Sequence, residues 1–241
     1  MRIIKTKEVI EGVLFEPFCY VYGDVSIGKD SSVCSGAVIK GDIKIGKNVQ
    51  IKENCVIVGN GFIGDNVVIG AGCKIDSPQI ESNVILGENT VIRKDCHIGE
   101  VCSSLEIETP TIISECCVLK SDVQIFAGAQ IDSLTTISSG VVVGWKAKIE
   151  PNTRLKKYVF PFCAPLSRGI VLKLDDNTLG KEERDFFKEC LSDLISSQKR
   201  SFLRDRVISW QKKSEFHALL PYFKCYIEFL QKTNHLYDTR Y

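Results

Sequence analysis

Residues 45–75 read IGKNVQIKENCVIVGNGFIGDNVVIGAGCKI, with isoleucine at every sixth position. The same six-residue period, always with a large apolar side chain, extends over residues 3–75 without exception. A one-residue deletion near Pro78 and a three-residue insertion near Val101–Ser104 interrupt it, and it ends at Leu155. A pattern this long must be read as an internal repeat before any single motif is considered.

A second position of the repeat supports the first. Two residues before each large apolar residue the side chain is small or modest, as at Cys19, Ala37, Cys55 and Cys73. One large and one small inward residue per hexad suit a narrow three-sided coil, because short strands point alternate residues inward. A period of six fits neither an α-helix nor a heptad. The sequence therefore predicts a mainly β fold, a left-handed parallel β-helix, over residues 1–155.

The repeat stops at Lys156. Residues 156–179 predict an apolar strap or linker, and residues 180–241 predict an α-helical C-terminal domain. Apolar side chains recur at helical spacing within that domain and predict three helices, over residues 181–198, 202–212 and 214–232. Pro221 is expected to kink or divide the third helix, because proline disrupts a helix interior.

Composition excludes several classes of protein. Lysine and arginine number 31 against 30 acidic residues, so the formal net charge is only +1 and does not favour nucleic acid as a partner. The first residues alternate charged and apolar, and no run approaches the roughly 18 apolar residues of a membrane span. We therefore expect a cytoplasmic protein without a membrane span. Eleven cysteines, an odd number without a CxxC pair, predict reduced structural thiols and no metal site.

Several hexads resemble a known family. They read IGKDSSV (27–33), IGKNVQI (45–51), IGDNVVI (63–69), LGENTVI (86–92) and VGWKAKI (143–149). These segments resemble the repeats of the hexapeptide-repeat transferases. The order of a β-helix followed by a short helical domain is most similar to UDP-N-acetylglucosamine O-acyltransferase and related sugar acyltransferases.

The resemblance implies an activity and an assembly. Members of this family are homotrimers that transfer an acyl group to a hydroxyl or amine of a sugar or nucleotide sugar. The donor, acyl-CoA or acyl carrier protein, lies in the groove between neighbouring prisms, and no cofactor is tightly bound. A histidine serves as the general base.

His97 is the single histidine within residues 1–155 and is therefore the candidate base. It precedes the inward Ile98 and should point outward, close to the insertion. In the family the histidine commonly falls two residues after the repeat aliphatic, where this chain has residues such as Lys29, Lys47 and Lys94. The alternative is that His97 is an ordinary surface or interface imidazole.

Gly144, Trp145 and Lys146 align with coils that hold the acyl donor in the family. Trp145 is expected to point outward and could stack on an adenine, with Lys146 near phosphates. In the alternative interpretation, Trp145 packs against the C-terminal helices.

Two other functions share this fold. A non-catalytic assembly or regulatory module needs only flat faces that hold partners, and the absence of a histidine at the usual family position favours it. A γ-class carbonic anhydrase needs three histidine ligands from two subunits. The single histidine of residues 1–155 argues against that enzyme.

Overall fold

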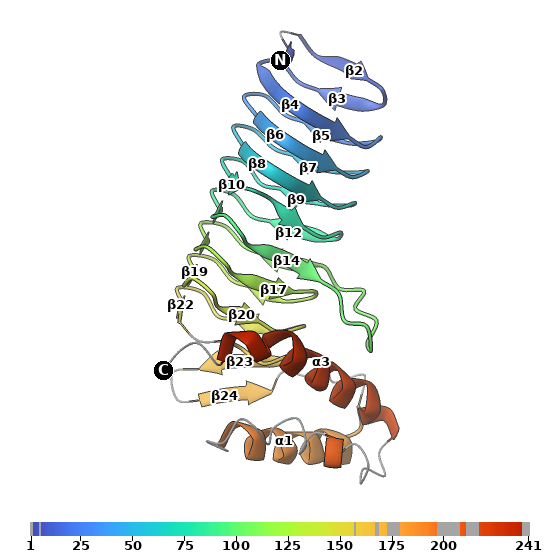
Figure 1. Cartoon of the computed structure of the whole chain (residues 1–241), viewed down its shortest axis with the longest axis vertical. Helices are drawn as coiled ribbons and strands as arrows, with labels where there is room; N and C mark the ends of the chain where they lie inside the picture. The colour runs from blue at the N-terminus through green and yellow to red at the C-terminus, as the bar shows by residue number, and fades with distance from the viewer. Residues whose placement is uncertain are drawn as a thin grey trace.

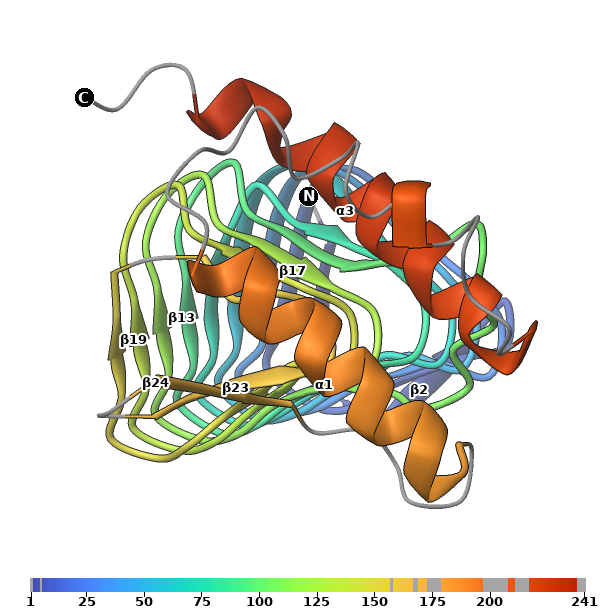
Figure 2. The ribbon, with the colours of Figure 1, turned by 90° about the horizontal axis from the view of Figure 1, so that it is seen from below.

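The computed structural model describes residues 2–4, 6–156, 158–166, 169–172, 179–196, 208–210 and 217–237. Short strands wind into stacked coils that form a long prism, and helices lie at its C-terminal end (Figure 1). Figure 2 shows the three-sided outline of the coils. The predicted fold class, a left-handed parallel β-helix with C-terminal helices, is confirmed.

Two sheets form the three walls of the prism. The thirteen-stranded sheet contains β1 (Arg2–Ile4), β4 (Cys19–Ile27), β6 (Val38–Ile45), β8 (Val56–Ile63), β10 (Lys74–Asp76), β11 (Gln79–Ile80), β13 (Val91–Ile92), β14 (His97–Glu100), β16 (Val118–Leu119), β17 (Gln124–Phe126), β19 (Thr136–Ile137), β20 (Val142–Val143) and β22 (Arg154–Leu155). The nine-stranded sheet contains β2 (Glu8–Ile10), β3 (Val13–Phe15), β5 (Ser32–Val33), β7 (Gln50–Ile51), β9 (Val68–Ile69), β12 (Val84–Leu86), β15 (Thr111–Ile113), β18 (Gln130–Ile131) and β21 (Lys148–Ile149). Because β8 pairs with β10 along one half and with β11 along the other, the larger sheet bends into two walls.

The six-residue period places the core inside the coils. Strand partners in adjacent coils are three hexads apart, as in Tyr20↔Val38 and Val38↔Val56. Ile57 and Cys55, the large and small residues of one hexad, have no exposed surface. Phe62 pairs with Gln79, whereas three full hexads would lead to Ile80, and this register confirms the deletion near Pro78.

The insertion is longer than the sequence pattern predicted. A regular coil would pair Val84 with Cys102, but its partner is Thr111, so this coil is half as long again as the others. Residues 101–110, which we call the insertion loop, leave the prism between β14 and β15. Resuming the six-residue period after a three-residue insertion would make Ile107 a core residue of the next coil, but it lies in this loop and is half-buried against the core. The predicted length was wrong because Ile107 and Ile113 happen to be one hexad apart.

The first two predicted hexads are also not coils. Ile3 and Val9 are 43% and 68% exposed, whereas Ile4 is buried. β1 pairs antiparallel with β4, and β2 pairs antiparallel with β3. The chain therefore turns back on itself here instead of continuing the parallel ladder. The regular inward pattern begins near Phe15, which pairs in parallel register with Val33.

The C-terminal part covers the last coil. The strap continues the ladder through a bridge between Val143 and Val159. It then forms an antiparallel pair of β23 (Cys163–Leu166) and β24 (Gly169–Leu172). Among the residues that the structure describes, the chain continues with α1 (Lys181–Ser196), a short helical stretch at 208–210, the 3-10 turn η2 (His217–Leu219) and α3 (Leu220–Tyr237). Figure 1 shows α3 lying across the end of the prism beside β20 and β23.

The middle predicted helix and Pro221 both lie in the helical region. Most of the expected helix over 202–212 falls outside the described residues, although residues 208–210 are helical. Pro221 does not kink α3, because it is the second residue of that helix. Proline is tolerated in the first turn, where its missing N–H would have no helical partner.

All eleven cysteines are free thiols, as the sequence predicted. Within the part of the chain that the structure describes, no helix is long and apolar enough to cross a membrane.

Candidate active site

His97 projects outward from the wall that contains β11 and β14. Its neighbour Ile98 is fully buried, so strand alternation turns the imidazole away from the core. Nε2 of His97 lies 2.9 Å from Oε1 of Glu81, which directly follows β11. The side chains of His97 and Glu81 are 31% and 37% exposed. This half-exposed imidazole–carboxylate pair is available to a ligand.

The contact with Glu81 determines which histidine nitrogen can act as a base. When Nε2–H donates to the carboxylate, the lone pair lies on Nδ1, the second ring nitrogen. Phe62 packs edge-on against the imidazole, with ring centroids 6.4 Å apart at 85°. The carboxylate and the phenyl ring therefore fix the orientation of His97 and leave Nδ1 as the candidate base.

The insertion loop begins directly after β14 and docks on α3. The Ser103 hydroxyl donates to Oε2 of Glu228 at 2.7 Å, and the Ser103 N–H donates to the same oxygen at 3.0 Å. Lys232 donates to the carboxylate of Glu100 and lies 3.4 Å from that of Glu228. These charged hydrogen bonds hold the insertion loop and the end of β14 against α3.

The same contacts shift two pKa values. Burial alone would raise the pKa of Glu228, but hydrogen bonds from Ser103 outweigh it and lower that pKa. Burial alone would lower the pKa of Lys232, but Glu100 and Glu228 outweigh it and raise that pKa. Both groups are therefore held in their charged forms.

The structure does not support Trp145 as a surface on which an adenine ring could stack. Its side chain is fully buried, and its indole N–H donates to the carbonyl of Glu100 at 2.8 Å. The ring packs on Phe126 at 4.4 Å and on Phe229 of α3 at 6.3 Å, measured between centroids. The alternative interpretation, packing against the C-terminal helices, is the one that the structure shows. With both neighbours in place, no room remains for an adenine ring.

Gly144 and Lys146 lie on either side of this tryptophan. The Gly144 N–H donates to the carbonyl of Val159 at 2.9 Å. A Cβ at Gly144 would lie 2.4 Å from the backbone nitrogen of Pro161, so the close approach of the strap requires glycine. Lys146 is half-buried. Only Lys146 of the three predicted donor-binding residues therefore keeps a side chain within reach of solvent.

Glu81 was missed by sequence reasoning. A signal for it exists in the coil register, because Gln79 pairs with His97 and Glu81 lies just beyond the end of that strand. Gln79 and His97 are 18 residues apart, which is the regular spacing of three hexads, because the one-residue deletion near Pro78 lies before both of them.

A hollow of about 320 Å³ lies on a different wall, in the nine-stranded sheet. Its lining consists of Ile112, Ser114, Gln130, Ile131, Asp132, Lys148, Ile149 and Glu150. His97 is not among these residues. The candidate base and the hollow are therefore separate features.

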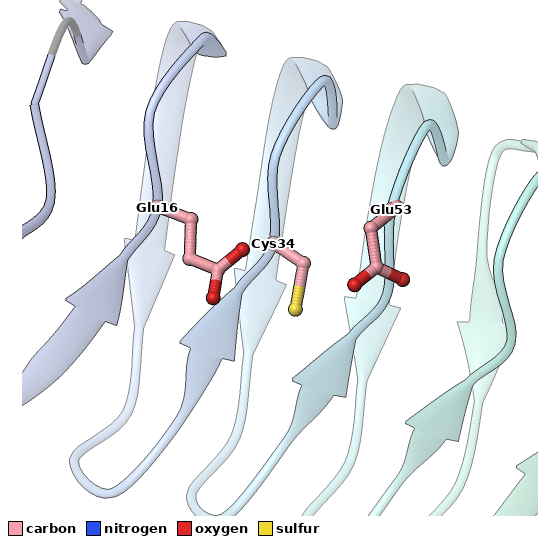
Figure 3. Close-up of side chains that lie close together, drawn as sticks. All are labelled: Glu16, Cys34 and Glu53. Carbon is pink, nitrogen blue, oxygen red and sulfur yellow. The ribbon is translucent and has the colours of Figure 1, made fainter.

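Glu16, Cys34 and Glu53 form a group that could hold a metal ion, with ligand atoms all within 4.8 Å of one another (Figure 3). Ser35 donates its hydroxyl and its N–H to Oε2 of Glu16, at 3.2 and 3.3 Å. Burial and the two glutamates raise the pKa of the Cys34 thiol. A metal would have to displace that proton, which weakens the case for a site here.

No known family profile and no curated protein matches this sequence. Among solved structures, LpxA from Acinetobacter baumannii is 19% identical, covers 95% of each chain and has a TM-score of 0.76. The UDP-N-acetylglucosamine acyltransferase of Francisella novicida is 18% identical, over 95% of this chain and 89% of that one, with a TM-score of 0.61. The corresponding enzyme from Campylobacter jejuni is 17% identical, over 93% and 96%, with a TM-score of 0.55. The chain thus shares the fold of these acyltransferases over nearly its whole length.

Proposed function

We propose that the protein is an acyltransferase that moves an acyl group from acyl-CoA or acyl carrier protein to a sugar or nucleotide sugar. The observation that carries the proposal is the His97–Glu81 pair on an open wall beside the insertion loop. A general base needs a free lone pair and a fixed orientation, and this pair provides both. The shared fold with acyltransferases supports the choice of reaction.

The proposed reaction proceeds at Nδ1 of His97. Nδ1 takes the proton of an acceptor hydroxyl or amine while the acceptor atom attacks the thioester carbonyl carbon. The C–S bond then breaks, and the imidazolium returns the proton to the leaving thiolate. Glu81 stabilises the imidazolium throughout, as the buried carboxylate does in a catalytic triad.

We further propose a homotrimer that works in the cytoplasm, as the resemblance to the family implies. Flat walls can pack against copies of the same chain, and the donor would lie between them, with Lys146 as a candidate contact for its phosphates. Gly144 and Trp145 then act indirectly, since they hold the strap and α3 in place.

The test is a transfer assay with acetyl-CoA and acyl carrier protein as donors and UDP-N-acetylglucosamine as the acceptor probe, with products read by mass spectrometry. We expect His97→Ala to lower the rate by about 100-fold or more, the usual contribution of a general base. Glu81→Gln should lower it less, because the base remains. Gln50→Ala, a matched polar change on the nine-stranded wall, should leave it unchanged. Full activity in His97→Ala, or no transfer from either donor, would refute the proposal.

A second candidate, a non-catalytic assembly module, is favoured by exposed apolar side chains near the N-terminal end of the prism. Val9, Phe18 and Tyr22 are 68%, 64% and 53% exposed there. Apolar side chains grouped on a surface often mark interaction sites. A stable complex that is lost in Phe18→Ser, together with the absence of acyl transfer, would favour this function.

A further inference from the structure

The glutamate that contacts His97 occupies a position where the preceding coils have glycine. At this corner of the prism, the residue after the inward isoleucine is glycine in three successive coils: Gly28, Gly46 and Gly64. Glu81 takes the same place in the fourth coil. The N–H of each glycine donates to the carbonyl of the inward residue in the next coil, and the N–H of Glu81 donates to that of Ile98 at 2.8 Å. The backbone of Glu81 therefore follows the glycine pattern, and only its side chain departs from it.

A side chain at this position should collide with the next coil. A Cβ added to any of the three glycines would lie 2.6 or 2.7 Å from the carbonyl carbon of the residue at the same position in the next coil. A separation under 3.0 Å is one that real Cβ atoms essentially never show. The side chain of Glu81 can therefore fit only if the next coil departs from the regular geometry.

The next coil departs from that geometry at Gly99. The pairing of β14 with β17 shifts by one residue between Ile98 and Glu100, so Gly99 is the extra residue of a β-bulge. Its φ is +92°, which glycine adopts far more readily than residues with a Cβ. None of the three glycines earlier in the stack has a positive φ. The bulge thus lies directly beyond the one coil of this stack that carries a glutamate.

We propose that Gly99 is a positioning residue, whose bulge makes room for the side chain of Glu81 and thereby maintains its hydrogen bond with His97. The remaining space is small. A Cβ at Gly99 would lie 3.1 Å from Cβ of Glu81 and 2.9 Å from Cγ2 of Val84. Because the Cβ of Glu81 is fixed to its backbone, a side chain at position 99 should displace the whole glutamate from the imidazole.

The inference deepens the proposed acyl transfer, on which it rests for the role of His97 as the base. Gly99 has no side chain and acts only through Glu81, whose Oε1 lies 2.9 Å from Nε2 of His97. A base held in one orientation removes a proton faster than one that rotates. Loss of the contact should therefore lower kcat and leave KM unchanged.

The first measurement is independent of activity and uses the ring 15N shifts of His97 in the full-length protein. The chain has three histidines, so His97→Ala assigns the signals. We expect Gly99→Ala to move these shifts to the values found in Glu81→Gly, because both changes remove the same hydrogen bond. Gly99→Asn should act in the same way, and it guards against misfolding because asparagine tolerates a positive φ better than alanine.

Gly36→Ala is the matched control. Gly36 also has a positive φ, +74°, and it lies in an earlier coil, where an added Cβ would meet Oδ1 of Asn54. Its replacement has a similar backbone cost but should leave the His97 shifts at their wild-type values. A crystal structure of Gly99→Asn should show Oε1 of Glu81 beyond hydrogen-bonding range of His97. Wild-type shifts in both Gly99 variants would overturn the proposal and assign the bulge to the insertion loop alone.

The transfer assay separates the positioning role from the proposed function. We expect kcat of Gly99→Asn to fall by the same factor as that of Glu81→Gly, with KM unchanged. The double variant should fall no further, because both changes act through one contact. Additive losses in the double variant would overturn the positioning role. If the wild-type protein transfers no acyl group, the proposed function fails, while the ring shifts still decide whether Gly99 positions Glu81.

Discussion

The two ends of the prism cover the apolar interior of the coils in different ways. At the C-terminal end, the strap and α3 bury an aromatic cluster that includes Phe126, Trp145 and Phe229. At the N-terminal end, the described residues cover the coils with short antiparallel strands, and Phe18 and Tyr22 stay exposed. A stack of coils has an apolar interior along its whole length, so each end needs a cap. The difference predicts that the C-terminal cap contributes more to stability than the N-terminal one, because it buries more apolar surface.

The largest effect should come from removing an aromatic residue of the C-terminal cap. Phe229 contacts Phe126 and Phe160, each at 5.8 Å between ring centroids. We expect Phe229→Ala to lower the free energy of unfolding by about 3–5 kcal/mol, because it leaves a cavity in a packed cluster. This loss is measured by denaturant-induced unfolding monitored with circular dichroism. The matched change Phe18→Ala at the open end should stay within about 0.5 kcal/mol, and equal losses in both variants would contradict the comparison.

A smaller difference in stability loss is expected between a regular coil and the N-terminal hairpin, where the six-residue pattern does not form a coil. Ile57 is fully buried in a regular coil, whereas Val9 is 68% exposed in the hairpin. Ile57→Ala should cost about 2–5 kcal/mol, and Val9→Ala should cost less than about 0.5 kcal/mol. The same unfolding assay measures the stability loss of both variants. A large loss in Val9→Ala would mean that the first hexads are coils after all.

The smallest effect concerns Glu228, which joins the insertion loop to α3. Its pKa is lower in the folded chain, so it stabilises the fold above its unfolded pKa, and this contribution is lost as the pH falls through the folded pKa. We expect Glu228→Gln to cost about 1 kcal/mol at neutral pH. The difference from wild type should shrink as the pH falls below about 4. A difference that grows in acid would show that the carboxylate is not held in its charged form.

Periodicity predicted the interior of the molecule well, because the geometry of a coil dictates which position of each hexad points inward. Ile57 and Cys55 could be placed inside without any structure. The same rule failed wherever a residue matched the period without lying in a coil. Val9 lies in a terminal hairpin with most of its side chain exposed, and Ile107 lies in the insertion loop, half-buried against the core.

The candidate site could be predicted only in part. The outward direction of His97 followed from its buried neighbour Ile98. The partner Glu81 lies in the adjacent coil, where Gln79 and His97 have the regular spacing of three hexads, so the repeat register could have pointed to it. For Trp145 the sequence left two interpretations open, because the helix that covers it, α3, begins only at Leu220, far along the chain.

The central claim is that His97, oriented by Glu81, faces a bound acyl donor. A crystal structure of the protein soaked with acetyl-CoA tests it most directly. The attacking acceptor atom would lie within hydrogen-bonding range of Nδ1 of His97. We expect the thioester carbonyl carbon of the bound donor within about 4 Å of that point. Donor bound in the hollow lined by Gln130 and Lys148, with the His97 wall empty, would contradict it.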